Sequence, residues 1–589
     1  MEKIDKIIEN KTALLQKLTK NKNIISLLRG LVFIIIAVFF LIFFLWNKDY
    51  YYLGGGLITI VVFIYLIFLS SILREKIEFN LNFIEICQQI QNKNKSIKNA
   101  IDDKIIDIKN HPYCLDLDIL GKSSLFEKID ISQTIIGNNQ LKQFLLNPLT
   151  KKEAILKRQD AIKELSTKLE WNINILTLAK DIVINANTED SFIKTDKNLL
   201  ANKKTIKTIL PALPIINGIL ILCSVLFFSS AIISLVLGFM IIIYTIIHII
   251  YGKDINNIYV SNDLKSLQYK QFAKIFQQTK NENFKSDINK ENQMILFKAL
   301  PSIEKMSILL RNFEKGYIPI FGGLLNIVLS WNLYHAIKLE KLQVKLQNDV
   351  PIWFKTFAEV EAFICFGIFA YKYNKYTYPI IDSGVAGGMK IKNLSHPLIL
   401  QKNIVENNFS THINDITIIT GANMTGKSTF LRAIGVNLVL AMNGCPVAAN
   451  YFRFYPMNLF TSMRTFDSLA DDSSYFNAEI KKLKFLMEQL ENNIPQYIIL
   501  DEILKGTNSY DKLMGSKLFL EKIIKINTPF SCLIATHDLE LTKIEKEYPE
   551  NIENYCFELQ SGNPDYKLKK GITKTMNAIR LLKEYKIID

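Results

Sequence analysis

A run of glycine, lysine and serine residues offers the clearest chemistry in this sequence of 589 residues. Gly421, Gly426, Lys427 and Ser428 follow the spacing G-x-x-x-x-G-K-S, in which backbone N–H groups surround the phosphates of a nucleotide. Glycine lets the backbone approach the phosphates, lysine supplies a positive charge, and the serine hydroxyl is a ligand for Mg²⁺. Residues 421–428, called the phosphate loop below, therefore predict a site for ATP and Mg²⁺.

The elements on either side of the phosphate loop must position it. Residues 418–420 read as a buried strand, and the segment that begins at Thr429 reads as a helix. The N-terminus of a helix carries a partial positive charge that attracts anions. A strand, a glycine-rich loop and a helix in this order are the setting that such a loop requires.

Two later strands end in side chains that suit ATP hydrolysis. Residues 497–502, YIILDE, read as a buried parallel strand that ends in two adjacent carboxylates. We expect Asp501 to hold Mg²⁺ through water and Glu502 to polarise the attacking water. Residues 531–537, SCLIATH, read as another buried strand, and the order of the elements favours His537 as a sensor of the γ-phosphate.

These three blocks resemble the ATPase motifs of the MutS family of DNA mismatch-repair proteins. GANMTGKST at residues 421–429 is similar to the family's G-x-N-M-x-G-K-S-T loop, which implies that Asn423 and Met424 also contact the nucleotide. DEILKGTNSYD at 501–511 and ATHDLELT at 535–542 resemble two further family segments. The resemblance implies a Mg²⁺-dependent ATPase of the ABC type, with Glu502 and His537 as its catalytic residues and with Ser428 and Asp501 as its metal ligands.

The same resemblance implies a second subunit. Ser474, Phe476 and Glu479 match the family's S-x-F-x-x-E, a segment that in MutS proteins reaches into the partner's nucleotide site. We therefore expect a homodimer with two composite sites. Ile404 and Val405 occupy the position where the family clamps adenine between an aromatic and an aliphatic side chain, and here the aromatic residue is missing.

Residues upstream resemble the helical core, or lever, domain of MutS proteins. The matching motif positions are Gly137, Leu141, Leu145, Pro148, Arg158 and Gln159. The domain that reads mismatches through an F-x-E motif is not evident. Phe83 and Glu85 have that spacing, but they lie in a helix-like segment, for which we favour helix packing.

Long apolar runs set this chain apart from a soluble ATPase. Residues 30–47 and 50–73 form two uncharged runs of about 18 and 24 residues, and residues 208–252 form another of about 45. A helix needs about 20 apolar residues to cross a bilayer, so we expect four transmembrane helices in two hairpins. Residues 317–336 are less apolar at one end and contain two glycines, and we expect them to form a buried helix.

Basic residues flank both hairpins on what should be the same side of the membrane. They are Lys3, Lys6, Lys11, Lys17, Lys20, Lys22 and Arg29 before the first, Arg74 and Lys76 after it, and Lys203, Lys204, Lys207 and Lys253 around the second. The positive-inside rule therefore places the ATPase and both termini in the cytoplasm, with the chain in the inner membrane. The seven cysteines have no C-x-x-C spacing, so no disulfide framework or zinc site is indicated.

The predicted fold class is a multidomain chain, part all-helical and part α/β. We expect a basic N-terminal helix at 1–29, a transmembrane hairpin at 30–73, a juxtamembrane helix and the start of the core at 74–207, a second hairpin at 208–252, the helical core at 253–390, and an ABC-type P-loop ATPase with a mixed or parallel sheet at 391–589.

Two functions are open from the sequence. The formal net charge of +15 suits DNA as a partner, so one hypothesis is a membrane-anchored ATPase that binds DNA when it binds ATP and moves its levers on hydrolysis. The alternative is an ABC-superfamily ATPase that acts on lipid or on a protein at the membrane. An export pump is disfavoured because residues 474–479 lack an L-S-G-G-Q signature, and the intact ATPase motifs disfavour an inactive scaffold.

Overall fold

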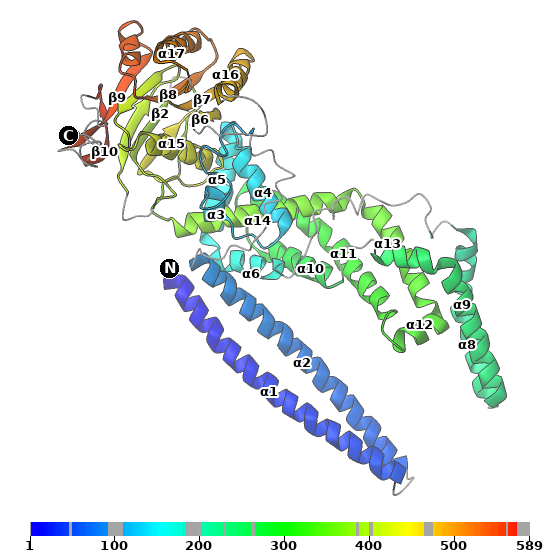
Figure 1. Ribbon diagram of the computed structural model, residues 1–589. Helices are drawn as coiled ribbons and strands as arrows, with labels where there is room; N and C mark the ends of the chain where they lie inside the picture. The colour runs from blue at the N-terminus through cyan, green and yellow to red at the C-terminus, as the bar shows by residue number, and fades with distance from the viewer. Residues whose placement is uncertain are drawn as a thin grey trace.

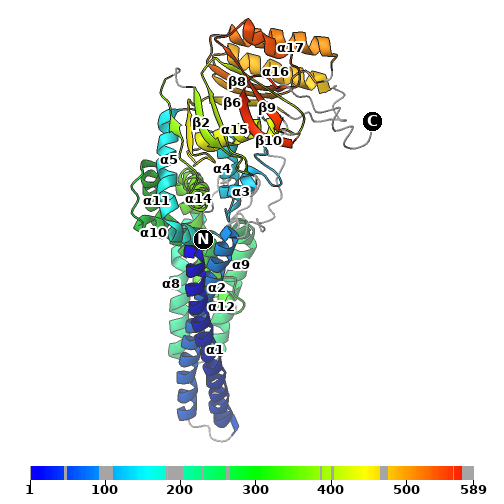
Figure 2. The same ribbon diagram turned by 90° about the vertical axis from the view of Figure 1, so that its left-hand side faces the viewer.

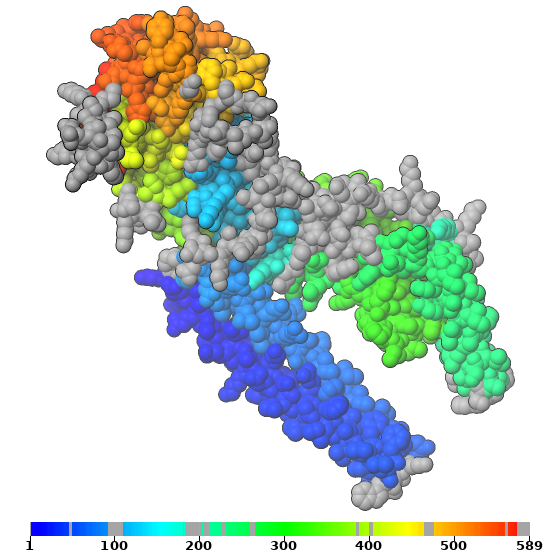
Figure 3. Space-filling model, viewed as in Figure 1, coloured from blue at the N-terminus to red at the C-terminus, as the bar shows by residue number. Residues whose placement is uncertain are grey.

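The computed structural model of the chain describes residues 2–45, 50–91, 110–180, 203–227, 230–260, 266–384, 388–399, 404–463, 475–505, 507–560 and 563–573, together with Ile182 and Leu200. A part that contains the sheets lies at one end of the molecule, a helical part lies in the middle, and two helical hairpins project away from it on the same side (Figures 1 and 2). The space-filling view shows the two hairpins standing clear of each other (Figure 3).

The first hairpin consists of α1 (Glu2–Leu45) and α2 (Tyr50–Gln91). The predicted basic N-terminal helix and the first apolar run form one helix, since no proline or other helix breaker separates them. Along residues 30–73 large apolar side chains such as Leu45, Ile58 and Phe68 are exposed. Beyond this run α2 becomes part of the helical core: Phe83 is buried and Glu85 pairs with Lys180, as helix packing predicts for this pair.

The second hairpin consists of α8 (Lys204–Phe227) and α9 (Ser230–Val260). Among the described residues, three helices are long and apolar enough to cross a membrane, namely α1, α2 and residues 231–259 of α9. The apolar part of α8, residues 211–224, is shorter. The composition therefore supports three of the four predicted spans fully and the fourth in part.

Residues 317–336 do not form the single buried helix that we expected from their sequence. Helix α11 (Asp287–Lys315) is followed by the short α12 (Phe321–Leu329) and then by α13 (Trp331–Leu346). Ser330, with φ of 50°, interrupts the helical backbone between α12 and α13. The side chain of Ile320, just before α12, is 86% exposed. Asn326 stabilises the turn that precedes α12: its buried amide donates to the carbonyl oxygens of Gly316 (3.0 Å) and Gly322 (2.8 Å).

The helical core surrounds α14 (Asp349–Lys372), which is buried along most of its length. Its neighbours are α3 (Leu125–Ile129), α4 (Ile135–Leu146), α5 (Lys152–Thr167), α6 (Leu169–Ala179), α10 (Ser266–Asn281), α11 and α13. Glu361 of α14 accepts hydrogen bonds from the backbone N–H groups of Gln133 (2.6 Å) and Thr134 (3.0 Å) just before α4. Gly137 is needed beside it, because a Cβ there would lie 2.0 Å from the Glu361 Oε2.

Glu361 should make the stability of the core depend on pH. Burial raises the pKa of its carboxyl to about 7, although hydrogen bonds from Thr134 and Gln133 oppose the rise. Because the folded pKa exceeds the usual 4.5, the folded chain binds the proton more tightly, so the free energy of unfolding falls as pH rises from about 4.5 to about 7. In Glu361→Gln we expect denaturant titrations to lose this fall, which is on the order of 3 kcal/mol. An unchanged pH dependence would contradict the assignment, and Glu540→Gln, at an exposed carboxylate, is the control.

The larger sheet has six strands in the order β10-β9-β4-β8-β7-β6. They are β4 (Ile416–Gly421), β6 (Asn458–Ser462), β7 (Gln496–Asp501), β8 (Phe530–Thr536), β9 (Ile552–Gln560) and β10 (Asn563–Lys570). All neighbouring pairs are parallel except β9 and β10, so the sheet is mixed. After β8 the chain forms the short 3-10 helix η4 (Leu541–Lys546), and β9 follows it in the chain.

Strand residues alternate between two helical layers, as the pleat requires. Ile419, Ile499 and Leu533 face the core that contains α15 (Lys427–Met442), whereas their neighbours face α16 (Tyr475–Glu491) and α17 (Ser509–Ile524). A smaller sheet has the order β1-β5-β2-β3, from β1 (Ile380–Ile381), β2 (Met389–Leu394), β3 (Asn407–Thr411) and β5 (Tyr451–Phe454). The predicted combination of helical parts with an α/β part is confirmed, and of the two sheet types left open, mixed or parallel, the structure has the mixed one. The assignment to the ABC type stays a prediction.

Candidate functional site

The phosphate loop joins β4 to α15, as its sequence predicts. Gly421 ends the strand, and Lys427 begins the helix. Gly426 has φ of 104°, and a Cβ at Gly421 would lie 2.7 Å from the Phe557 carbonyl oxygen, so the loop needs glycine at both places. Asn423 and Met424 are exposed at the tip of the loop, Ser428 is half-buried and Thr429 is exposed.

Lys427 is the cation at the centre of the site. Its side chain is buried, and its Nζ donates to the carbonyl oxygens of Gly421 (2.7 Å) and Ala422 (3.0 Å). Burial lowers the pKa of Lys427 to about 8, and the negative charges of Asp501 and Glu502 oppose that change. The ammonium group therefore lies within electrostatic reach of both carboxylates.

The sheet brings the other predicted residues to the same edge. Strands β4, β8 and β7 are adjacent and parallel, so the phosphate loop, His537 and Asp501 all follow the carboxyl ends of neighbouring strands. Glu502 is anchored by its N–H, which donates to the Ala535 carbonyl oxygen at 3.0 Å. Its Oε1 lies 4.0 Å from His537 Nε2, and Lys512 Nζ lies 3.4 Å from the same oxygen.

The surroundings of His537 favour its neutral form. Burial lowers its pKa, and the neighbouring Lys427 lowers it further, while Glu502 opposes the shift. A neutral imidazole can donate one hydrogen bond and accept another. Such a side chain can orient a phosphate oxygen or a water molecule without adding a second positive charge beside the lysine.

The oxygen atoms at this edge fit Mg²⁺. Among the described residues no group of three or more His, Cys, Asp and Glu side chains could enclose a metal ion. Mg²⁺ keeps several waters and is usually bound by one or two protein oxygens together with substrate phosphates. Ser428 and Asp501, the residues expected to hold Mg²⁺, follow β4 and end β7 in the same sheet.

The part of the chain that holds this site is similar to known proteins. Residues 417–581 match MutS domain V. Human MutS protein homolog 4 is 33% identical over 204 residues, which is 32% of this chain and 21% of that protein. The DNA mismatch repair protein MutS of Caldanaerobacter subterraneus subsp. tengcongensis is 33% identical over 229 residues (37% of this chain, 25% of that protein), and that of Carboxydothermus hydrogenoformans is 30% identical over 250 residues (41% and 28%).

Residues 417–581 are therefore similar to the domain V of MutS proteins. The match spans about a fifth to a quarter of the length of these relatives. The MutS domain V match includes the phosphate loop, Asp501, Glu502 and His537, whereas Ile404 and Val405 lie before it.

Tyr566 is a residue of the MutS domain V site that the sequence did not reveal. It lies in the β9–β10 hairpin, and its Cδ1 would be 3.1 Å from a Cβ on Gly426. The hairpin is bonded to the segment that follows Ile404 and Val405: Asn407 Nδ2 donates to the Tyr566 carbonyl oxygen (3.0 Å), and Lys567 Nζ donates to that of Glu406 (2.7 Å). An aromatic ring from a distant strand thus lies beside the phosphate loop.

Glu479 has a contact within its own MutS domain V. Its buried carboxylate accepts hydrogen bonds from the backbone N–H groups of Leu504 (2.7 Å) and Lys505 (3.1 Å). A buried carboxylate needs such donors, so Glu479 fixes the turn that follows Glu502. Phe476 is 37% exposed on α16, and Ser474 lies outside the described residues.

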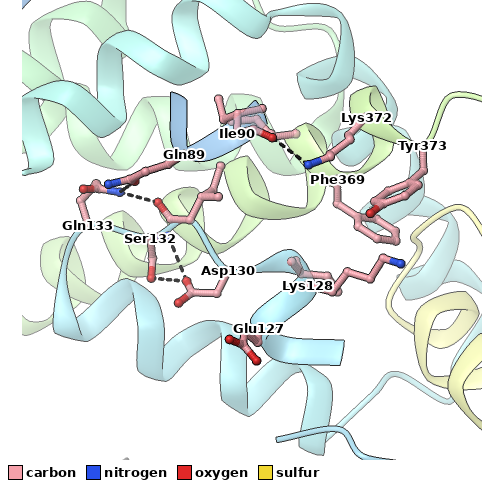
Figure 4. Close-up of a pocket in the computed structure, with 13 residues that line it drawn as sticks. Gln89, Ile90, Glu127, Lys128, Asp130, Ser132, Gln133, Phe369, Lys372 and Tyr373 are labelled. Atoms are coloured by element: carbon pink, nitrogen blue, oxygen red, sulfur yellow. Dashed lines mark hydrogen bonds between the residues drawn. The ribbon is translucent and has the colours of Figure 1, made fainter. Parts of the chain in front are cut away.

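A second polar hollow, of about 40 Å³, lies away from the MutS domain V site (Figure 4). Lys372 at the end of α14 donates to the Ile90 carbonyl oxygen at the end of α2 (2.8 Å), and Gln133 donates to Gln89 Oε1 (3.3 Å). Lys128 donates to the Pro397 carbonyl oxygen, in the segment that leads into the ATPase part. Three elements that are far apart in the sequence therefore meet at this hollow.

Proposed function

We propose that the chain is a membrane-anchored ATPase of the MutS type that acts on DNA. The observation that carries this proposal is the gathering of Lys427, Asp501, Glu502 and His537 at one edge of the sheet in a MutS domain V. The named mismatch-repair relatives support a role in DNA processing, and the two apolar hairpins support the anchor.

In the proposed reaction, Lys427 leaves the carbonyl oxygens of Gly421 and Ala422 and binds the β- and γ-phosphates of ATP. Ser428 and Asp501 would hold Mg²⁺, which neutralises charge on the phosphates when bound. Glu502 accepts a hydrogen bond from the attacking water and polarises it. Lys512 and His537 keep the Glu502 carboxylate in place through their proximity to its Oε1.

The proposed active form is a homodimer. A serine hydroxyl from the partner's Ser474 segment would complete each nucleotide site, with Phe476 at its edge, so hydrolysis would depend on how closely the two subunits approach. Glu479 would act within its own chain by fixing the turn after Glu502.

Contacts at the far end of α15 give the nucleotide site a mechanical connection to the helical core. Arg158 Nη1 donates to the Asn443 Oδ1 (2.8 Å) at the end of this helix, and the Leu149 N–H donates to the Met442 carbonyl oxygen (3.3 Å). The core in turn contacts the first hairpin through Lys372 and Ile90. We propose that movement of α15 on ATP binding reaches the anchor by this route.

The anchor consists of the two hairpins in the inner membrane, with the ATPase and both termini on the cytoplasmic side. The basic residues around each hairpin support this orientation. DNA would be held through phosphate contacts by the basic chain, without reading of mismatches. The rival function, action on lipid or on a membrane protein, is favoured by the large exposed apolar surface of the hairpins.

The rival functions can be separated by what stimulates hydrolysis. We expect homoduplex, mismatched or branched DNA to stimulate the ATPase of the full chain in nanodiscs at about 50 mM salt, and the effect to decline steeply as salt is raised. The measurement is phosphate release, with anionic lipid as the comparison. Stimulation by anionic lipid without any effect of DNA would reject the DNA proposal in favour of the rival.

Tyr566 should strengthen ATP binding by stacking on the base. We expect Tyr566→Ala to weaken binding by about 1–2 kcal/mol, or roughly 5- to 30-fold, because stacking on an aromatic ring is lost. Tyr566→Phe keeps the ring and should bind ATP like the wild type. Titration with a fluorescent ATP analogue measures both variants, and equal affinity of Tyr566→Ala and the wild type would rule out this role.

A further inference from the structure

We propose that α12 and the turn before it lie in the membrane interface and contact lipid without crossing the bilayer. This inference rests on the proposed anchoring of the second hairpin, and it adds a third membrane contact at the end of the helical core. The contact surface consists of Ile318, Ile320, Phe321 and Leu324.

The sequence of this segment suits lipid but is too short to span it. Residues 317–334 carry no aspartate, glutamate, lysine or arginine, and Lys315 and Lys338 lie on either side. Helix α12 has 9 residues. At 1.5 Å per residue it is about 14 Å long, less than half of the roughly 30 Å of a hydrocarbon core.

Its large apolar side chains are uncovered. Ile320 is 86% exposed, Leu324 58% and Phe321 52%. Removing apolar surface from water is favourable by about 25 cal/mol for every Å², so these side chains are more stable in an apolar environment than in water. Contiguous exposed apolar residues of this kind mark an interaction surface.

The neighbours of α12 identify lipid as the occupant. Asn217 of α8, which is 1% exposed, donates to the carbonyl oxygens of Ile327 (3.1 Å) and Val328 (2.8 Å) at the end of α12. The outward faces of α8 and α9 next to it are themselves apolar and exposed, as at Leu222 and Leu237. Figures 1 and 2 both show α12 beside this hairpin, on the side of the body from which both hairpins project. The surface of α12 therefore continues the surface that faces lipid in the proposed anchor.

Several backbone groups at the two ends of α12 are paired inside the protein, as the interior of a membrane requires. Asn326 donates to Gly316 and Gly322, and its Oδ1 accepts from the Asn332 N–H at 2.8 Å. Asn326 thus contacts backbone groups at both ends of α12, and Asn217 contacts those at its C-terminal end. Irregular backbone is tolerated at membrane depth when it is paired inside the protein in this way.

Aromatic and polar side chains mark the water side of the segment. Tyr317 stacks on Tyr259 with ring centroids 4.6 Å apart, and Trp331 Nε1 donates to the Asn312 carbonyl oxygen at 2.6 Å. A hollow of about 470 Å³ between α9 and the α12–α13 break has both apolar and polar side chains in its lining, the polar ones including His248, Lys253, Asn256 and Asn332. Tyrosine and tryptophan are enriched at the membrane–water boundary, so this border sets α12 at a shallow depth.

Three leucines of similar exposure allow a matched test. Leu324 of α12, Leu237 of α9 and Leu518 of α17 are 58%, 50% and 59% exposed. Each is replaced by cysteine in the full chain, with Cys223→Ser because the other six cysteines are buried. A nitroxide spin label at each position is measured in nanodiscs of phosphatidylethanolamine and phosphatidylglycerol. Collisions with oxygen report lipid, and collisions with a soluble nickel chelate report water.

We expect the label at position 324 to collide more often with oxygen than with nickel, as at 237 but at a shallower depth, while the label at 518 favours nickel. A label at 324 that behaves as at 518, with 237 in lipid, overturns the α12 proposal and leaves the anchor standing. A label at 324 shielded from both reagents indicates contact with a second copy of the chain and also overturns it. If the label at 237 favours nickel, the proposed anchor itself is rejected.

Discussion

Replacing Glu502 with glutamine should leave ATP binding intact and slow hydrolysis by about 10²- to 10⁴-fold. The change keeps the shape of the side chain, and the Glu502 N–H still donates to Ala535, so the phosphate loop should be undisturbed. What is lost is the carboxylate that polarises water beside His537. Phosphate release measures turnover, and a fluorescent ATP analogue measures binding.

A matched control is available on the surface of the same domain. Glu547 pairs with Lys517 at 2.7 Å and is half-exposed, so Glu547→Gln should hydrolyse ATP at the wild-type rate. Retained hydrolysis in Glu502→Gln would show that another group activates the water.

Replacing Lys427 with alanine should weaken ATP binding by at least roughly 100-fold, or about 3 kcal/mol. In the wild type its charge offsets Asp501 and Glu502, which lie close enough to influence its pKa. Without the lysine these carboxylates would face a triphosphate with no cation from the protein between them, and repulsion would add to the loss of the direct contacts. Titration with the fluorescent analogue gives the affinity.

The fold of the variant needs its own control. Lys427 makes its hydrogen bonds inside the phosphate loop, so the rest of the sheet should remain, and thermal unfolding followed by circular dichroism checks this. Lys517→Ala removes a surface lysine from α17 and should bind ATP like the wild type. Wild-type affinity in Lys427→Ala would place the nucleotide elsewhere.

The placement of the candidate site residues at one edge of the sheet could be predicted because its determinants are local. A phosphate loop needs glycine, lysine and serine at fixed spacing, and parallel strands carry their terminal residues to one edge. Gly421, Lys427, Asp501 and His537 could therefore be placed together before any distance was known. The combination of helical parts with an α/β part was predicted in the same way, but whether the sheet is mixed or parallel was not.

The parts that the sequence did not predict depend on distant contacts. Tyr566 reaches the phosphate loop only because β10 pairs with β9 and the hairpin is bonded to Asn407. Glu479 matches a family motif by its spacing, yet its carboxylate is taken up by Leu504 and Lys505. No local pattern in the chain distinguishes these outcomes.

The prediction of a buried helix at residues 317–336 was wrong for a different reason. Apolar residues without an obvious polar face predict burial, but the same composition suits contact with lipid. The structure leaves Ile320 and Leu324 exposed, which excludes burial, and the broken backbone is paired in part by Asn217, which lies in another helix.

Phosphate release by the full chain in nanodiscs, with ATP and Mg²⁺, tests the central claim most directly when the wild type is compared with Lys427→Ala and Glu502→Gln. We expect steady turnover in the wild type and only background release in both variants, with ATP still bound by Glu502→Gln. Equal turnover in all three proteins would contradict the assignment of this edge of the MutS domain V as an ATPase site.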